Sequence, residues 1–254
     1  MQEIVSLPPN KKIYFASDFH FGIPDYETSL QREKKVCNWL DEIRKDAFQI
    51  YLLGDLFDAW MEYKRVVPKG FVRFLGKLAE LSDAGIEIQV FTGNHDLWMH
   101  GYFEKELNIK VFKTIKTMTI HNKKFLIGHG DGLSKHEKKY KLMKGVIQHP
   151  FSQFLYRQLH PNVGIGIADY FSRLGPKHKY LEVKLKPFEQ EYQWQFATEY
   201  LQKEKIDYFI FGHRHLSYDT QLNTTSRLIN LGDWISLDTF AEFDGNDLLL
   251  KKWK

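Results

Sequence analysis

Short apolar runs separated by amphipathic segments dominate the first half of the chain. Between the first three runs, apolar residues recur at steps of three and four, which predicts one helix ending near Ile43 and a second over residues 71–81. Thr28 and Gln31 have the spacing of a capping box, and Gly85 is placed to end the second helix. The runs themselves are rich in β-branched and aromatic residues and predict buried strands over residues 12–17, 49–53, 87–92, 124–128 and 207–211.

The C-terminal part has a different pattern. Its apolar segments "SRLINLGDW", "TFAEFD" and "NDLLLKKW" predict strands joined by short turns, such as the one at Asp244, Gly245 and Asn246. A βα unit followed by strand-rich segments indicates an α/β fold with two packed sheets and helices outside. We expect a single domain over residues 1–254.

Residues 133–190 do not follow the pattern of alternating strands and helices, and they are called the insertion from here on. They combine aromatic residues, Gly and Pro with eleven Lys and Arg against four Asp and Glu between Leu133 and Glu189, although the whole chain carries only +4. The positive charge therefore belongs to this segment. We interpret it as a helical insertion across one end of the sandwich.

Composition limits the class of protein. With 254 residues and 43% hydrophobic composition, the chain can bury a full core. The single cysteine, Cys37, excludes an intrachain disulfide and a thiolate zinc site. The first residues lack the apolar stretch of a signal peptide, and no run of about 18 apolar residues is present. We therefore expect a cytoplasmic protein.

Five short polar motifs each follow a predicted strand: "SDFH", "GDLFD", "GNHD", "GHGD" and "FGHRH". Alternate residues at a strand end project to the same side, so each motif can direct two side chains to one point. Imidazoles and carboxylates suit divalent first-row ions. The motifs supply seven candidate ligands, too many for one tetrahedral ion but enough for two that share a carboxylate: Asp18, His20, Asp55, Asn94, His129, His213 and His215.

A purely structural explanation exists for each motif alone, because Asn, Asp and Gly are common in turns. A turn has no need of His95, however, and two imidazoles at one strand end, His213 and His215, rarely serve packing. The five motifs together favour a metal site. Asp58 is expected to orient a neighbouring ligand. No glycine-rich phosphate loop of the G-x-x-x-x-G-K type is present, so ATP-driven chemistry has no support.

At these residues the chain resembles the calcineurin-like metallophosphoesterases, whose signature is D-x-H, G-D-x-x-D, G-N-H-D/E, a following His and G-H-x-H. All five blocks match. The resemblance implies a four-layer αββα sandwich with a dinuclear site, expected to hold manganese, with iron or zinc as alternatives. It also implies the distribution of the ligands: one ion held by Asp18, His20, Asp55 and His215, and the other by Asp55, Asn94, His129 and His213.

Within that family the residues of these motifs are most similar to those of the UDP-2,3-diacylglucosamine hydrolases of lipid A synthesis. "LGDLFDAW" resembles their L-G-D-L-F-E-x-W, and the insertion occupies the place of their acyl-chain lid. This implies cleavage of a pyrophosphate in a nucleotide-linked glycolipid. The resemblance also implies that His95 contacts phosphate or protonates the leaving oxygen, with Asp96 fixing its ring. The chain departs from the pattern at His95, where those enzymes usually carry Arg.

The insertion is expected to bind the lipid part of such a substrate. Each buried CH₂ of an acyl chain would contribute about 0.8 kcal/mol. Its cations are expected to meet phosphates or an anionic inner-membrane surface. The alternative is an ordinary helical hairpin with its apolar side in the core. The apolar residues of this prediction are Phe151, Phe154, Leu155, Phe171 and Leu174, and the basic ones are Lys135, Lys138, Lys139, Lys141, Arg157, Lys177 and Lys179.

Three other functions remain open from the residues. A metallophosphoesterase acting on soluble nucleotides or other small phosphoesters would use the same ligands, with an insertion that serves only specificity. A nuclease would use them too, but no repeated basic and aromatic groove is evident, so nucleic acid is not expected as a partner. A non-catalytic scaffold on this fold would be expected to have lost ligands, and all seven are present.

Overall fold

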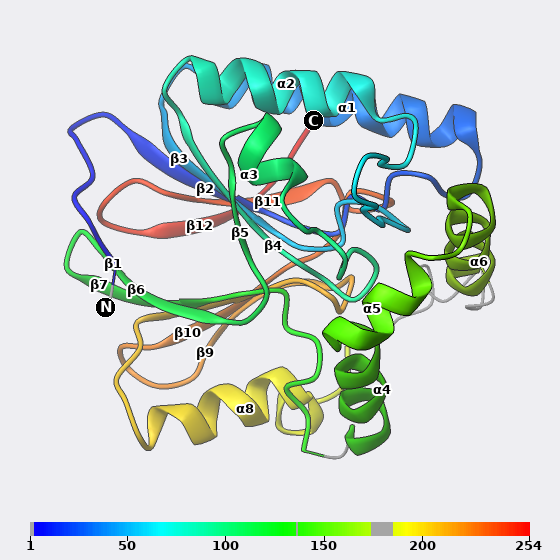
Figure 1. Ribbon diagram of the computed structural model, residues 1–254. Coiled ribbons are helices and arrows are strands. Elements are labelled where there is room, and N and C mark those ends of the chain that lie inside the picture. The colour runs from blue at the N-terminus through cyan, green and yellow to red at the C-terminus, as the bar shows by residue number, and fades with distance from the viewer. Residues whose placement is uncertain (1–2, 136, 174–184) are drawn as a thin grey trace.

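The computed structural model describes residues 3–135, 137–173 and 185–254. Within them, two six-stranded sheets form the centre of the molecule (Figure 1). The first sheet has the order β12-β11-β2-β3-β4-β5. Its strands are β2 (Lys12–Ala16), β3 (Ala47–Leu53), β4 (Glu87–Phe91), β5 (Lys110–Phe112), β11 (Thr239–Phe243) and β12 (Leu248–Lys252).

The second sheet has the order β1-β6-β7-β8-β10-β9. Its strands are β1 (Glu3–Val5), β6 (Lys116–Ile120), β7 (Lys123–Ile127), β8 (Tyr208–Phe211), β9 (Ser217–Gln221) and β10 (Arg227–Leu231). The five strands predicted from apolar runs all form. The short strands β1 and β5 and the partly exposed β9 and β6 have weaker patterns and were not predicted.

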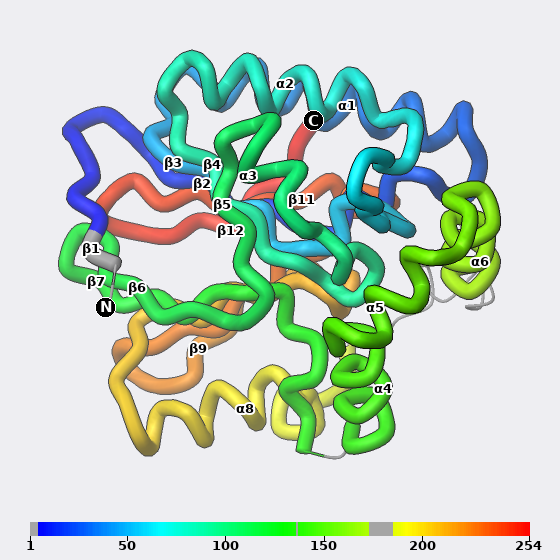
Figure 2. Tube along the Cα trace, in the orientation of Figure 1, coloured from blue at the N-terminus to red at the C-terminus, as the bar shows by residue number. Residues whose placement is uncertain are grey.

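Helices lie outside both sheets and at one end of the molecule (Figures 1 and 2). The helices α1 (Tyr26–Ile43), α2 (Val72–Asp83) and the short α3 (Tyr102–Glu106) lie on the side of the first sheet, and α8 (Tyr192–Leu201) covers the second. The insertion contains α4 (Lys138–Gln148), α5 (Pro150–Tyr156), α6 (Pro161–Arg173) and the 3-10 turn η1 (Phe188–Gln190). In Figure 1 its three α-helices stand at the right-hand end.

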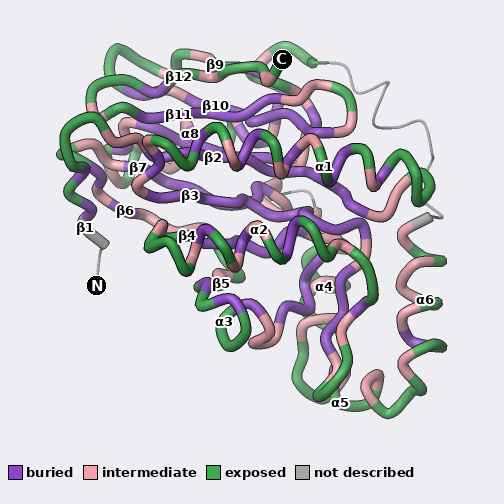
Figure 3. The backbone as a smooth tube through the Cα atoms, turned by 90° about the horizontal axis from the view of Figure 1, so that it is seen from above, coloured by how far each residue is buried: buried purple, intermediate pink, exposed green. Residues whose placement is uncertain are grey.

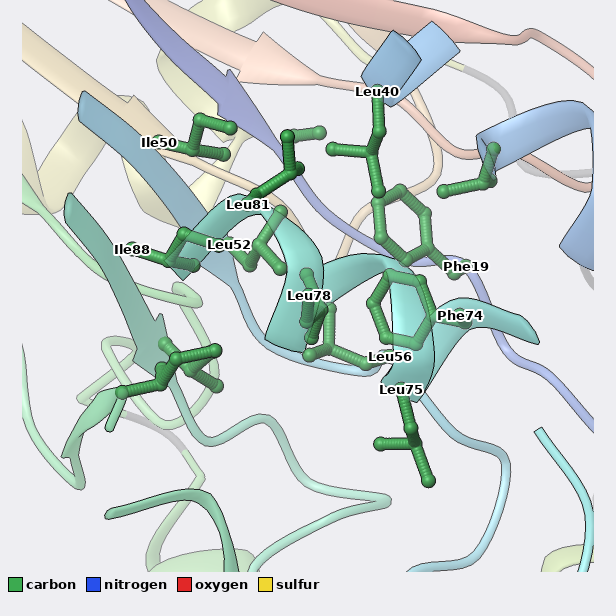
Figure 4. Close-up of a cluster of buried hydrophobic side chains, with 14 of the residues drawn as sticks. Phe19, Leu40, Ile50, Leu52, Leu56, Phe74, Leu75, Leu78, Leu81 and Ile88 are labelled. Atoms are coloured by element: carbon green, nitrogen blue, oxygen red, sulfur yellow. The ribbon is translucent and has the colours of Figure 1, made fainter. Parts of the chain in front are cut away.

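The buried side chains form three apolar interfaces between four layers, which are helices, first sheet, second sheet and helix. Phe15 and Tyr51 of the first sheet pack with Phe125 of the second to form the core between the sheets. Residues of α1 and α2, such as Leu40 and Leu78, pack on the outer face of the first sheet. Figure 4 shows Leu78 and Leu81 of α2 near Leu52 of β3, and Phe74 near Phe19.

The outer face of the second sheet is covered in the same way, because Phe209 and Leu228 pack against Ala197 of α8. In Figure 3 the central strands are mostly buried, whereas the insertion helices show many exposed and intermediate residues. The expected four-layer αββα sandwich is therefore confirmed.

Parallel pairing brings the ends of the functional strands together. β2, β3 and β4 are neighbours and run parallel, as do β7, β8 and β10 in the other sheet. The residues that follow parallel strands lie at one edge, where α/β proteins bind ligands. Four of the five polar motifs directly follow β2, β3, β7 and β8, and "GNHD" comes two residues after β4.

The first helix starts earlier than the predicted capping box. The N-cap is Asp25, whose side chain accepts hydrogen bonds from the backbone N–H and hydroxyl of Thr28 at 2.8 and 2.9 Å. The prediction that Thr28 and Gln31 cap this helix is wrong, because Asp25 is an equally good cap residue three positions upstream. Gly85 ends the second helix region in a left-handed conformation, with φ +85°.

Candidate metal centre

The carboxylates of Asp18 and Asp55 lie at the centre of the strand-end cluster. Asp18 is 0% and Asp55 1% exposed. Oδ2 of Asp55 lies 3.6 Å from Nε2 of His20 and 3.1 Å from Nε2 of His129, so one oxygen faces imidazoles from both sheets. Oδ1 of Asp18 lies 3.8 Å from Nε2 of His20 and 3.5 Å from Nε2 of His215. This geometry places Asp55 between two groups of side chains.

The group around His129 also includes Asn94 and His213, so it combines residues from three strand ends. Nε2 of His129 is 3.2 Å from Oδ1 of Asn94 and 3.2 Å from Nδ1 of His213. Seven predicted ligands from five motifs are thus brought to one edge of the sandwich.

Three sets of acidic and imidazole ligand atoms lie within 4.8 Å of one another in the described residues. They are Asp18 with His20 and His215, Asp55 with His129 and His213, and His20 with Asp55 and His95. The first two sets correspond to the two predicted ion positions, and Asn94 adjoins the second. The third set shows that His95 stands beside the same carboxylate.

Three of the four predicted histidine ligands have a partner on their other ring nitrogen. Nδ1 of His129 lies 2.8 Å from the carbonyl oxygen of Leu53; since a carbonyl only accepts, Nδ1 carries the proton and leaves the Nε2 lone pair for a metal. Nδ1 of His20 lies 3.4 Å from Oδ1 of Asp58, and Nδ1 of His215 lies 3.3 Å from Oδ2 of Asp233. Carboxylate or carbonyl support of this kind raises the basicity of a ligating imidazole.

The backbone at the site adopts a conformation that side chains other than glycine rarely accept. A left-handed residue with a side chain is uncommon and costs of order 1–3 kcal/mol where the surroundings impose it. Such residues cluster at functional sites. Five of the seven predicted ligands have φ between 44° and 68°: Asp18, His20, Asp55, His213 and His215.

Two glycines allow the motifs to approach one another closely. A Cβ atom on Gly93 would stand 2.1 Å from Oδ1 of Asp55, and one on Gly212 would stand 2.3 Å from Oδ2 of Asp18. The carbonyl of Gly212 is held by Nε2 of Gln193 at 3.0 Å and Nδ2 of Asn230 at 2.8 Å. Glycine is therefore required here by proximity to the two central carboxylates.

Electrostatics in the cluster follow from burial and opposite charge. Burial alone would lower the pKa of His129, but the Asp55 carboxylate outweighs it and raises that pKa to about 10. The pKa of His20 is likewise raised to about 10, against burial, by Asp18, Asp58 and Asp55. No carboxylate of the described residues forms an ion pair with His213, and burial followed by repulsion from His129 lowers its pKa to about 4.

The donor set fits divalent cations. Buried carboxylates need a compensating charge, and among the described residues the side chains that form ion pairs with Asp18 and Asp55 are all imidazoles. No lysine or arginine of the described chain pairs with either. Nitrogen and oxygen donors in this mixture are those that manganese, iron and zinc accept.

His95 and Asp96 occupy different surroundings from those expected. Nδ1 of His95 lies 2.8 Å from the backbone oxygen of Asp58 and 3.6 Å from its Oδ1. Asp96 instead accepts hydrogen bonds from the backbone N–H groups of Gly93 and Leu56 at 2.6 and 2.8 Å. Burial and the Asp55 charge raise its pKa to about 7. The prediction that Asp96 fixes the His95 ring is wrong; Asp58 lies beside that ring, and Asp96 holds the turn.

The edge of the sandwich that carries the seven predicted ligands is called the metal edge from here on. Sequence reasoning did not identify two other residues that lie there. Asp233 supports His215 and also accepts hydrogen bonds from the N–H groups of Ile235 and Ser236. Its "LGDW" repeats the Leu-Gly-Asp of "LGDL", a signal that could have identified it. Ser172 of α6 donates to Oδ2 of Asp58 and lies 3.4 Å from Nδ1 of His95. No spacing rule links a distant serine to this motif.

The start of the insertion is tied to the same edge. Lys144 Nζ lies 2.6 Å from Oδ2 of Asp131, which also accepts the Tyr140 hydroxyl at 2.5 Å. Both donors come from α4, and Asp131 follows the ligand His129 by two residues. Among the lysines of the described insertion, Lys144 therefore forms the ion pair that reaches the metal edge.

The predicted substrate-binding residues are dispersed over the insertion. Lys135 is 74% exposed and pairs with Glu199 of α8 at 2.6 Å, so the structure does not bring it to the metal edge. Nε of Arg157 donates to the backbone oxygen of Glu62 at 3.2 Å. Lys138, Lys139 and Lys141 are exposed, as are Phe151, Phe154, Leu155 and Phe171. Leu174, Lys177 and Lys179 lie outside the described residues.

The insertion helices bury only a small part of their apolar surface: Ile147, Tyr156 and Ala168 are partly buried and pack against a cluster of Met61, Leu97 and Trp98. The described α4 has no buried residue, and the only one in α5 is Gln153. Among the helices that the structure describes, none is both long and apolar enough to cross a bilayer.

Comparison with known proteins agrees with this geometry. A family model described as calcineurin-like phosphoesterase matches residues 11–217. A UDP-2,3-diacylglucosamine hydrolase of Porphyromonas gingivalis is 40% identical over 253 residues, which cover 94% of this chain and 97% of that protein. Proteins of the same name from Histophilus somni and Haemophilus influenzae are 25% and 26% identical, over 93% and 92% of this chain and 97% and 98% of theirs.

The contact between Gly93 and Asp55 gives a test of the site geometry. In Gly93→Ala the new methyl group must displace the Asp55 carboxylate, so we expect Mn²⁺ binding to weaken by roughly 10–100-fold, measured by calorimetric titration. Gly76→Ala is the control, because nothing lies within 4 Å of its Cβ position in α2. Equal Mn²⁺ affinity in both variants would contradict the assigned contact.

Proposed function

Because the chain belongs to the calcineurin-like phosphoesterase family, we propose that it hydrolyses the pyrophosphate of UDP-2,3-diacylglucosamine to UMP and 2,3-diacylglucosamine 1-phosphate. The observation that carries the substrate assignment is the 40% identity to the Porphyromonas gingivalis protein of that name, which extends over 94% of this chain. The match therefore spans the metal edge together with the insertion. A metallophosphoesterase acting on soluble nucleotides is the alternative.

The metal centre of this proposal uses the two sets of side chains described above. Asp18, His20, Asp55 and His215 hold one ion, and Asp55, Asn94, His129 and His213 hold the other. We propose manganese, with iron or zinc as alternatives, since all three accept this mixture of donors. When bound, such a pair supplies a water of lowered pKa and neutralises charge on phosphate oxygens.

His95 is proposed to face the phosphate. The Asp58 carbonyl, 2.8 Å from Nδ1, accepts the proton of that nitrogen and so directs Nε2 away from Asp58. The ring stands edge-on to His20, with centroids 4.8 Å apart, which keeps it at the edge of the ligand set. From there Nε2 can donate to a phosphate oxygen or protonate the leaving oxygen. Asp96 supports this indirectly by holding the turn that carries Asn94 and His95.

The insertion is proposed to bind the lipid part of the substrate. Phe151 and Phe154 are 62% and 60% exposed, which leaves their rings available to acyl chains. Lys138, Lys139 and Arg157 are proposed to meet phosphate or anionic headgroups, whereas Lys135 is engaged with Glu199. Through Ser172 the insertion touches Asp58 beside the ligands. A substrate with both a pyrophosphate and acyl chains would contact both regions.

Hydrolysis of the lipid substrate tests the proposal directly. The Mn²⁺-loaded protein is expected to release UMP from detergent-dispersed UDP-2,3-diacylglucosamine faster than it cleaves a panel of soluble nucleotides. Asp55→Ala should lower kcat/KM at least about 100-fold, since removing a shared ligand does more than removing a supporting partner. Asp83→Ala, an exposed carboxylate at the end of α2, is the control. Preference for soluble nucleotides would favour the alternative function.

A series at His95 separates phosphate contact from proton transfer. His95→Ala should lower kcat about 100-fold if the ring donates a proton or hydrogen bond in the transition state. His95→Arg should recover most of that loss if a cationic donor is sufficient, and little if proton transfer is required. Unchanged turnover of every phosphoester by His95→Ala would refute the role. Unchanged manganese content in these variants would separate His95 from the metal ligands.

We also propose peripheral contact of the insertion with an anionic cytoplasmic membrane surface. The paired change Phe151→Ser and Phe154→Ser should weaken co-sedimentation with phosphatidylglycerol vesicles by roughly 10-fold or more, because each buried Phe contributes about 1.5–3 kcal/mol. Val72→Ser, an exposed apolar residue on α2, is the matched control. Equal vesicle binding by all variants would contradict contact through this face.

A further inference from the structure

The inner side of α1 carries three polar residues where a surface helix normally buries apolar ones. Ser29, Arg32 and Glu33 are 5%, 4% and 4% exposed. Burying a charge is costly unless it has partners, so each residue is expected to serve neighbouring groups. Glu33 accepts hydrogen bonds from the N–H groups of Arg73 and Phe74 at the start of α2. Ser29 and Arg32 face the segment that carries the ligand His20.

The guanidinium of Arg32 holds this segment through its backbone. Nη2 donates to the carbonyl oxygen of His20 at 2.7 Å and to that of Ile23 at 2.5 Å. Oγ of Ser29 accepts a hydrogen bond from the N–H of Gly22 at 2.7 Å. One face of one helix therefore fixes three backbone polar groups between His20 and Ile23, at the end of the first metal-binding motif.

These contacts act on a residue whose backbone is strained. His20 has φ 44°. Its N–H donates to the carbonyl oxygen of Asp55 at 2.9 Å, and its own carbonyl accepts from Arg32. The peptide groups on both sides of His20 are thus held from opposite directions. A left-handed conformation with a bulky side chain persists only under such constraint.

The carboxylates that support the predicted ligands also act on the charge of Arg32. Burial lowers the pKa of the guanidinium, and the carboxylates of Asp233 and Asp58 act in the opposite direction. These are the carboxylates that orient His215 and His20. An arginine keeps its charge when buried, so Arg32 stays a cation at this position.

We propose that Arg32 is a positioning residue of the metal centre, which holds the His20 backbone in its ligating conformation. Arg32 does not touch substrate or the reacting atoms. The inference rests on the proposed metal-dependent function. It assigns a role to a helix that contributes no ligand.

Two substitutions separate geometry from charge. Arg32→Lys keeps the positive charge, but a single ammonium on a flexible stem does not reproduce the planar guanidinium that reaches both carbonyls. Arg32→Met keeps an apolar stem and removes the charge. If Arg32 acted by charge alone, its removal would make the site more anionic and tighten cation binding. If it acts by position, both variants lose affinity.

The test is calorimetric titration of the full-length apoprotein with Mn²⁺, without substrate. We expect both variants to bind Mn²⁺ roughly 10–100-fold more weakly than the wild type, and their kcat to recover toward the wild-type value at saturating Mn²⁺. Lys34→Met, an exposed residue on the same helix, is the control and should match the wild type. Thermal unfolding without metal establishes that each variant is folded, and if Arg32→Met is not, Arg32→Lys alone decides.

Wild-type or tighter Mn²⁺ binding by Arg32→Met would overturn the proposal, as would full wild-type affinity in Arg32→Lys. Failure of the proposed function gives a different result, because the wild type itself would then bind no Mn²⁺ or hydrolyse no phosphoester.

Discussion

Two carboxylates buried side by side govern the architecture of the strand-end site. Asp18 and Asp55 are almost fully excluded from water, and their described ion-pair partners are imidazoles, which with their ordinary pKa of about 6.5 are mostly neutral at neutral pH. Without metal, the proton is the available compensating charge, which explains why the pKa values of His20 and His129 are raised so far above that of a free imidazole. A divalent cation supplies the same compensation without requiring the imidazoles to be protonated. The cluster is therefore organised for cations.

The sandwich satisfies this constraint by bringing together strand ends that are distant in the sequence. His129 and His213 follow strands of one sheet, and Asp18 and Asp55 follow strands of the other. The apolar core between the sheets fixes their relative position. The remaining adjustment is local: left-handed residues turn the side chains inward, and Gly93 leaves room for Asp55. Such strained residues persist only where the surrounding structure constrains them.

The sequence predicted the fold and the set of clustered ligands well because both depend on local patterns. A buried strand followed by a polar motif is visible in the residue order, and parallel strands place their ends at one edge. Partnerships that depend on side-chain direction were not visible. The Gly93 turn directs the Asp96 carboxylate to backbone N–H groups, so Asp58 rather than Asp96 lies beside His95. Ser172 lies 114 positions from Asp58, its partner in space.

The insertion differs from the rest of the chain in what its apolar residues do. Among the described residues, most of the exposed large hydrophobic side chains lie between Leu142 and Phe171. A hairpin that served only to complete the core would bury them, and α4 and α5 do not. Yet both ends of this exposed segment are anchored beside the ligands, through Lys144 to Asp131 and through Ser172 to Asp58. A surface that is apolar outside and tied to a candidate metal centre inside is suited to a ligand with a hydrocarbon part and a phosphorylated part, because neither region alone would bind the whole of such a molecule.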